Sequence, residues 1–207
     1  MGNISRELLR KLVHLLQIFI IAGYTFLHFY FSPRIGVLVL TGLLLLLLEI
    51  EYFRIDYPTR IGFRITTFFS KFFLRKHEKN NITGAIFLVI SIILSFAAFD
   101  YQIALLALLF TVFGDLAAAL MGMAFGTKKI FRNKSYIGSF SGLLVNMLIG
   151  YVILPHEPSV FIAMAITATV VETLTQKLDD NLTVPLFSGF VGQMIVLWAK
   201  IALPPFF

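Results

Sequence analysis

The sequence predicts an all-α polytopic integral membrane protein, and three observations lead to this class. Of the 207 residues, 58% are hydrophobic, whereas soluble domains contain about 45–50% apolar residues. The mean hydropathy is +0.89, and the apolar residues come in long runs separated by short polar stretches. The absence of cysteine excludes disulfides, Cys-ligated zinc sites and thiol catalysis. We therefore expect a single transmembrane domain over residues 1–207.

About seven segments are long and apolar enough to be predicted as membrane-spanning helices. Their predicted limits are 12–31, 35–53, 82–99, 101–125, 138–154, 158–178 and 183–203. Residues that favour turns, such as Asn, Asp and Pro, lie between these segments. The N-terminal run begins like a signal peptide but shows no small-residue cleavage site, so we predict that it is retained as the first span.

The basic residues predict the orientation of these spans. Fifteen of the seventeen Lys and Arg residues lie on the side that holds the N terminus, and only Arg34 and Lys200 lie elsewhere. Cytoplasmic loops are enriched in Lys and Arg, so we expect the N terminus inside and the C terminus outside. The net charge of +6 therefore reflects membrane sidedness and implies no nucleic-acid partner.

The cytoplasmic segment 54–80 is predicted to contain an interfacial amphipathic helix. Over residues 60–79, Arg64, Lys71 and Arg75 share one helical face and Phe residues line the opposite one. A helix of this kind lies on the membrane with its basic face towards anionic lipid heads. Lining the entrance for an anionic substrate is the alternative role.

Three of the acidic residues inside the predicted spans stand out, because ionisable side chains are costly there and become candidates for function. Glu49, Asp115 and Glu172 each follow the outer start of their span by fourteen residues, which is roughly 21 Å along a helix. At a common depth their charges would repel one another unless a cation lies among them, and carboxylates together with phosphates suit Mg²⁺. The alternative is a set of buried ion pairs with basic residues: Arg10, Lys11 or Arg54.

A basic loop after the fourth span predicts an anion site beside these acids. The loop 127–142 carries four cations and leads into the fifth span, whose first amides would bind phosphate. Its candidate residues, with the glycine expected to cap the preceding helix, are Gly126, Lys128, Lys134, Ser135, Gly138 and Ser139. Arg10, Lys11 and His14 enter the same region from the first span. For Lys134, an ordinary cytoplasmic charge is the alternative to phosphate contact.

Two further patterns accompany this region. Asp179, Asp180 and Asn181 offer oxygen ligands at the inner end of the sixth span, although a turn or helix cap would use the same residue types. Small residues recur every fourth position beside Asp115 and predict a close helix–helix contact. They are Gly114, Ala118, Gly122 and Gly126.

Six short motifs, taken in order along the chain, resemble one family. They are ExxRKxxH (Glu7 to His14), ExxR (Glu51, Arg54), RKHE followed by TGA (Arg75 to Glu78, then Thr83), GDxxAALxGxxFG (from Gly114), KSYIGSxSG (from Lys134), and Glu172 followed by DDNLTVP. This set resembles the CTP-dependent polyprenol kinase family, which includes dolichol kinase, phytol kinase and the CTP-using diacylglycerol kinase. Ser135 stands where the family usually places Thr, and the hydroxyl is kept.

The resemblance implies transfer of the γ-phosphate of CTP to a membrane lipid alcohol at the cytoplasmic leaflet, with Mg²⁺. Asp115, Asp180 and Asn181 are then expected to hold the metal, and Lys134 with the turn at Gly138 to hold the phosphates. Glu172 is expected to be the base or a second metal ligand. Arg10, Lys11 and His14 are expected to complete the anion pocket or face the acceptor hydroxyl. The family motifs also add Glu51, in preference to Glu49, with Arg54, Arg75, Glu78 and Asp179.

Two other functions stay open on the sequence alone. The middle motifs are also similar to those of CDP-diacylglycerol synthase, a phosphatidate cytidylyltransferase. Intramembrane acids serve ion-coupled transporters as well, although here acids and cations crowd one side of the membrane. The sequence does not fix the lipid alcohol or the oligomeric state, for which a homodimer is one option.

Overall fold

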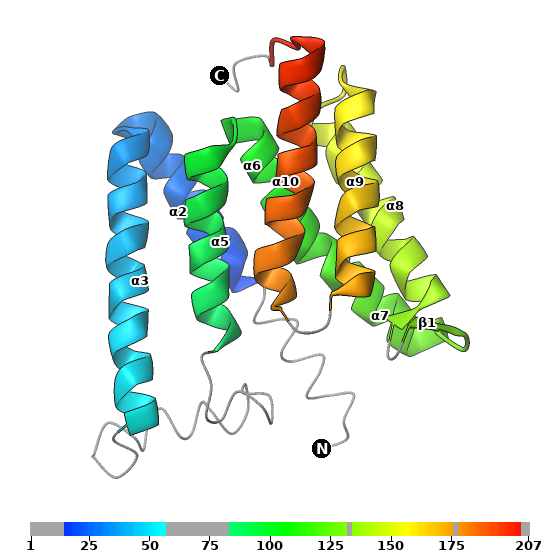
Figure 1. Ribbon diagram of the computed structural model, residues 1–207, viewed down its shortest axis with the longest axis horizontal. Coiled ribbons are helices and arrows are strands. Elements are labelled where there is room, and N and C mark those ends of the chain that lie inside the picture. The colour runs from blue at the N-terminus through cyan, green and yellow to red at the C-terminus, as the bar shows by residue number, and fades with distance from the viewer. Residues whose placement is uncertain (1–14, 57–82, 132–133, 176–177, 204–207) are drawn as a thin grey trace. The chain divides into compact units, whose positions relative to one another are not determined.

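The computed structural model describes residues 15–56, 83–131, 134–175 and 178–203, and these residues are mostly helical (Figure 1). The chain divides into two compact units, Met1–Ile90 and Ser91–Phe207. The predicted interfacial helix over 60–79 lies outside the described residues, so it stays a prediction.

The first unit contains a pair of apolar helices, α2 (Leu16–Tyr30) and α3 (Pro33–Asp56), which pack against each other. The short turn between them follows from its residues, because Ser32 Oγ accepts a hydrogen bond from the Ile35 amide at 3.3 Å and proline is favoured in the first turn of a helix. Gly36 lets the two helices approach, since a Cβ there would lie 2.8 Å from the Tyr24 ring. The start of α5 (Gly84–Ala98) also belongs to this unit.

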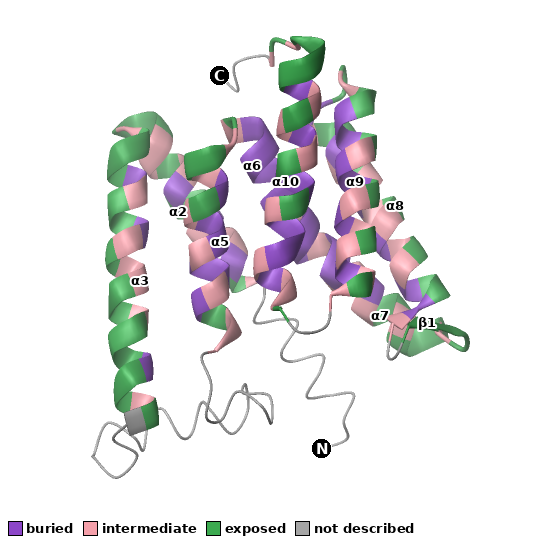
Figure 2. Cartoon of the chain, in the orientation of Figure 1, coloured by how far each residue is buried: buried purple, intermediate pink, exposed green. Residues whose placement is uncertain are grey.

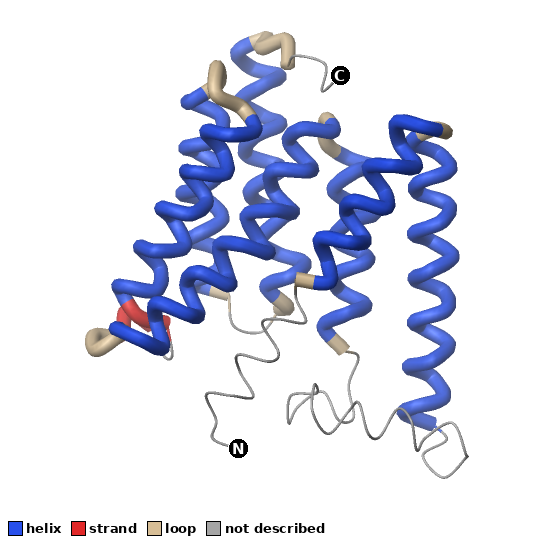
Figure 3. The backbone as a smooth tube through the Cα atoms, turned by 180° about the vertical axis from the view of Figure 1, so that it is seen from behind, coloured by secondary structure: helices blue, strands red, loops and turns tan. Residues whose placement is uncertain are grey.

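The second unit is built around one long helical rod. It consists of α6 (Tyr101–Leu109), a π-helical turn η2 (Phe110–Gly114) and α7 (Asp115–Phe125). Two short antiparallel strands follow, β1 (Lys129–Phe131) and β2 (Lys134–Ser135). The unit then continues with α8 (Tyr136–Ile153), α9 (Pro158–Leu174) and α10 (Asp180–Ala199). Figure 3 shows the strands in red at one end of this unit.

The helices of the second unit pack in sequence around α6. α8 contacts α7 and α9, and α10 contacts α9 and α6. Almost all of α6 is buried (Figure 2), and its residues Ile103 and Leu106 pack in one hydrophobic core with Met164 of α9. The outward faces are apolar as well, as shown by Leu148 at 65% and Trp198 at 88% exposure. Apolar residues both inside and outside are expected where lipid replaces water around the helices.

The α7–α8 contact is a seam of glycines. A Cβ on Gly138 would lie 2.6 Å from the Ala118 carbonyl oxygen, and one on Gly142 would lie 3.1 Å from the Gly114 carbonyl oxygen. The two helix backbones therefore touch directly, which only residues without a side chain permit. The predicted packing role of the small residues beside Asp115 is confirmed.

Each of the seven predicted spans corresponds to a helical rod in the described residues, and the helical class of the prediction is confirmed. In the part of the chain that the structure describes, four rods are long and apolar enough to cross a membrane: Pro33–Ile55, Tyr101–Phe125, Tyr136–Ile153 and Asp180–Ala199. Three apolar helices are shorter: Leu16–Tyr30, Gly84–Ala98 and Pro158–Leu174. The β1–β2 pair was not predicted.

Candidate functional site

Asp115 is positioned by the π-helical turn in the middle of its rod. Asp115 is the first residue of α7, directly after η2, and it is 8% exposed. A π-turn inserts one residue into a helix and is frequent at functional sites. The buried carboxylate therefore lies where the regular helical register changes.

Lys134 is brought to Asp115 by the strand pair and the start of α8. β2 pairs with β1, and Ser135, the last residue of β2, is the N-cap of α8. Ser135 Oγ accepts a hydrogen bond from the Gly138 amide at 3.1 Å, as an N-cap serine commonly does. The strand and the cap together fix the direction in which the Lys134 side chain leaves the backbone.

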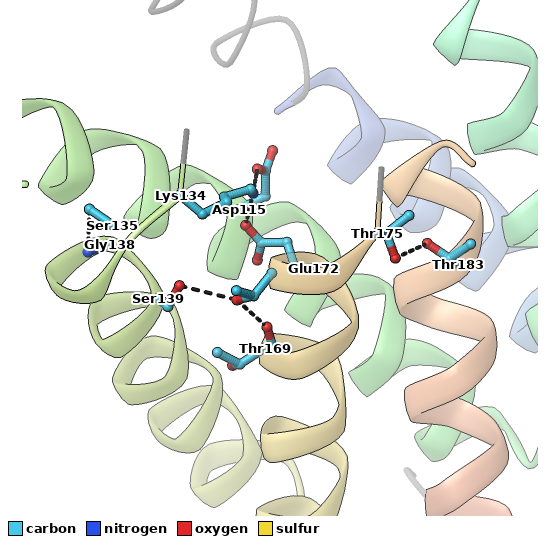
Figure 4. Close-up of polar contacts among 10 residues, drawn as sticks. Asp115, Lys134, Ser135, Gly138, Ser139, Thr169, Glu172, Thr175 and Thr183 are labelled. Carbon is cyan, nitrogen blue, oxygen red and sulfur yellow. Dashed lines mark hydrogen bonds and ion pairs between the residues drawn. The ribbon is translucent and has the colours of Figure 1, made fainter. Parts of the chain in front are cut away.

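Glu172 completes the cluster from α9, and Figure 4 shows Lys134 between the two acids. Lys134 Nζ donates to Glu172 Oε1 at 2.5 Å and lies 3.9 Å from Asp115 Oδ1. The side chains of Glu172 and Asp115 are 8% and 11% exposed, and that of Lys134 is 34% exposed. We call these three residues the acid–lysine cluster. It joins α7, β2 and α9, which are far apart in the sequence.

The charge state of the cluster follows from its electrostatics. Burial of the Lys134 side chain would lower its pKa. The charges of Glu172 and Asp115, the hydrogen bond to Glu172 and the charge of Asp180 oppose this effect and raise the pKa above its ordinary value. Lys134 is therefore a stable cation at neutral pH, and the field of Asp180 reaches the cluster from α10.

The residues of the acidic turn before α10 have different roles. Asp179 is the N-cap of α10, and its Oδ1 accepts a hydrogen bond from the Asn181 amide at 2.9 Å. This is the capping role that the sequence left open for the turn. Asp180 lies in the first turn of α10 and is partly buried, and Asn181 is 6% exposed. The negative charge of Asp180 acts on Lys134 and helps to raise its pKa.

The residues predicted to hold phosphate have different surroundings in the structure. The Gly138 amide already bonds Ser135 Oγ, so it is not free as the sequence led us to expect. Ser139 Oγ bonds Thr173 Oγ1 at 3.1 Å and ties α8 to α9 beside Glu172. Gly126 ends α7, and a Cβ there would lie 2.5 Å from Ser135 Oγ. Lys128 is exposed in the loop before β1.

The ExxR pair in the first unit forms a buried ion pair. Arg54 Nε donates to Glu51 Oε2 at 2.8 Å and Arg54 Nη2 donates to Glu51 Oε1 at 2.7 Å. The same Glu51 Oε1 accepts the Thr83 amide at 2.8 Å, just before α5. Glu49 is exposed, so its predicted place among the buried acids was wrong, and Glu51 is the buried acid of α3.

Several predicted site residues lie outside the described part of the chain: Arg10, Lys11, His14, Arg75 and Glu78. Their roles stay predictions. Within the described ranges, no group of three or more His, Asp or Glu residues could by itself hold a metal ion. A metal at the acid–lysine cluster would therefore need ligands from a bound molecule or from elsewhere in the chain.

Asn146 is a buried polar residue that the sequence analysis did not count among the site residues. It is 1% exposed on α8, and a Cβ on Gly114 would lie 2.5 Å from its Oδ1. No described residue gives this oxygen a hydrogen bond. A lone Asn in an apolar helix, four residues after the glycine seam, was the available signal.

Comparison with known proteins gives two relatives. The chain is 26% identical over 155 residues to CTP-dependent diacylglycerol kinase 1 of Saccharomyces cerevisiae, which covers 61% of the chain and 53% of that protein. It is 23% identical over 154 residues to the protein of the same name from Eremothecium gossypii, covering 61% of the chain and 49% of that protein. The chain thus spans about half the length of the curated relatives it matches. No family model and no solved structure matches.

These relatives confirm the resemblance that the six motifs predicted, namely to the CTP-dependent polyprenol and diacylglycerol kinases.

Proposed function

We propose that the chain is a CTP-dependent membrane lipid kinase, which transfers the γ-phosphate of CTP to a lipid hydroxyl. The observation that carries this function is the acid–lysine cluster, in which Lys134 lies between the buried Asp115 and Glu172. Two relatives named CTP-dependent diacylglycerol kinases support the donor and the acceptor class. The cluster contains both signs of charge that a metal–triphosphate complex requires.

The residues of the cluster fit Mg²⁺. The site already stabilises one cation, the Lys134 ammonium, against two buried carboxylates, and Asp180 adds a third negative charge nearby. In nucleotide sites Mg²⁺ is commonly bound through one or two carboxylates together with the phosphates. We assign Asp115 and Asp180, with Asn181, to hold the ion, which would neutralise charge on the phosphates.

Phosphoryl transfer depends mainly on alignment and charge neutralisation. In the proposed reaction the lipid hydroxyl oxygen bonds to the γ-phosphorus, and the bond from that phosphorus to the β–γ bridging oxygen breaks. CDP leaves, and the hydroxyl proton is released. Lys134 contacts the phosphates, and Arg10, Lys11 and His14 complete the anion pocket or face the hydroxyl.

We further propose that all seven rods cross the membrane with the N terminus inside and the C terminus outside. The distribution of Lys and Arg supports this orientation, which puts the acid–lysine cluster at the cytoplasmic face. The protein would then be integral to the cytoplasmic membrane of a prokaryote or to an ER-type membrane. The acceptor tail stays in lipid while CTP arrives from the cytoplasm.

Diacylglycerol is the first acceptor to test because it appears in the names of both relatives. Phytol-type alcohols and polyprenols present the same single hydroxyl on an apolar body, and the motif resemblance includes kinases that use them.

The test uses the purified 207-residue chain with CTP radiolabelled on its γ-phosphate, Mg²⁺ and a panel of these lipids in mixed micelles. We expect a labelled lipid monophosphate and CDP, and we expect Asp115→Ala to abolish transfer while the protein still folds. Pyrophosphate with a CDP-lipid would instead identify a cytidylyltransferase. If neither CTP nor ATP binds with Mg²⁺, the kinase is refuted and an ion-coupled transporter gains support.

A further inference from the structure

We propose that Glu172 is a positioning residue, which holds the Lys134 ammonium in place for the phosphates and binds no metal. This role rests on the proposed function and differs from the base or second metal ligand that the sequence suggested. It divides the two buried acids of the cluster, because Asp115 would serve the metal and Glu172 would serve the lysine.

The distances separate the two acids. The Lys134 Nζ to Glu172 Oε1 distance of 2.5 Å is a hydrogen bond, whereas the 3.9 Å to Asp115 Oδ1 is beyond hydrogen-bond reach. Lys134 is therefore hydrogen-bonded to Glu172, whereas it interacts with Asp115 through charge. A metal bound to Glu172 would lie close to the ammonium that already occupies one of its oxygens, and the two positive charges would repel.

The exposed fractions of the two side chains indicate that Lys134 lies nearer to the solvent than Glu172. The Lys134 side chain is 34% exposed and can meet a polyanion that approaches from outside. The Glu172 side chain is 8% exposed and contacts Lys134. Glu172 thus lies behind the lysine relative to the solvent, where it can direct the ammonium without touching the substrate.

The backbone around Glu172 is anchored. Its neighbour Thr173 bonds Ser139 across the α8–α9 contact at 3.1 Å, and Thr173 Oγ1 also donates to the Thr169 carbonyl at 2.7 Å (Figure 4). On the other side, Lys134 precedes the Ser135 N-cap of α8. Glu172 therefore lies on α9, which is tied to α8, and Lys134 lies on β2 directly before α8, whereas Asp115 lies on α7.

The test compares Glu172→Gln with Asp115→Asn in the purified 207-residue chain. Binding of a non-hydrolysable CTP analogue is measured directly, and the Mg²⁺ dependence is measured from turnover. Glu172→Gln should weaken analogue binding about tenfold, as expected for loss of one charge-assisted hydrogen bond, and leave the half-saturating Mg²⁺ concentration unchanged. Asp115→Asn should raise that Mg²⁺ concentration. Lys134→Gln combined with Glu172→Gln should bind the analogue no worse than Lys134→Gln alone.

Glu157→Gln is the matched control, because this acid precedes α9 at its other end and makes no side-chain cap bond. It should change neither quantity. If Glu172→Gln instead raises the Mg²⁺ requirement as Asp115→Asn does, or if the effects of Lys134→Gln and Glu172→Gln add, Glu172 does not act through Lys134.

A second readout does not depend on CTP. Acylation of Lys134 by an N-hydroxysuccinimide ester, followed by peptide mass spectrometry, reports how firmly its ammonium is held. We expect faster acylation in Glu172→Gln than in the wild type and in Glu157→Gln. An unchanged rate overturns the positioning role even if the wild type binds no nucleotide, whereas absence of CTP binding by the wild type counts against the proposed function alone.

Discussion

Gly138→Ala should disturb the site through the glycine seam. The added Cβ would lie 2.6 Å from the Ala118 carbonyl oxygen and 3.3 Å from the Gly122 Cα. Both are backbone atoms, so α7 and α8 must separate by several tenths of an ångström. Overpacking of this kind typically costs about 1–3 kcal/mol, and we expect a loss of stability in that range.

The separation should also affect catalysis. Lys134 and Ser135 precede α8, and Asp115 starts α7, so the shift widens the distance between the lysine and the acid. A misplacement of about 1 Å at reacting groups can cost about a hundredfold in rate. We expect Gly138→Ala to lose about ten- to a hundredfold in turnover per folded molecule.

Two alanine variants control for this result. Gly42→Ala places a Cβ with nothing within 4 Å and should leave the protein unchanged or stabilise it by about 0.5–1 kcal/mol, since glycine disfavours helix. Gly150→Ala, on the same helix as Gly138, meets the Phe161 side chain at 2.6 Å and should lose stability with little loss of turnover per folded molecule. The measurements are the denaturation midpoint in detergent and labelled phosphate transfer. Wild-type stability and turnover in Gly138→Ala would refute the direct backbone contact between α7 and α8.

Three further predictions follow from other contacts. Ser135→Ala removes the N-cap of α8 and should lower the free energy of unfolding by about 1 kcal/mol. An unchanged denaturation midpoint would contradict the cap. Glu51→Gln breaks the buried pair with Arg54 and should cost about 3–5 kcal/mol, whereas the same change at the exposed Glu49 should be nearly neutral. The raised pKa of Lys134 means that its ion pairs stabilise the fold at every pH below its unfolded pKa of about 10.4 and lose this effect as pH rises through the folded pKa. The midpoint difference between the wild type and Lys134→Met should therefore be constant from pH 7 to about 9 and shrink above about 10.4; a decline already near pH 8 would contradict the raised pKa.

The sequence predicted the helical rods well because apolar run length is a strong local signal. The limits 101–125 agree with the rod Tyr101–Phe125, and 183–203 differs from Asp180–Ala199 by only a few residues. The last difference arises because Asp179 caps α10, and a cap shifts a helix start into polar residues that a hydropathy pattern excludes.

The strand pair and the details of the site could not be predicted in the same way. β2 has two residues, too few for any alternation of apolar and polar side chains. Counting residues from the ends of the predicted spans correctly placed Asp115 and Glu172 at a common depth, since both belong to one cluster. It failed for Glu49, because a depth along the axis does not say which face of α3 is buried, and two residues further on Glu51 points inward.

The π-turn η2 has a consequence for how this chain is compared with others. One inserted residue turns everything after it by about 100° relative to an uninterrupted α-helix. Deleting one residue between Phe110 and Gly114 would therefore rotate the carboxylate at 115 away from its lysine while leaving hydropathy nearly unchanged. A homologue with a shorter rod could look equivalent in composition and yet lack the alignment on which the chemistry depends.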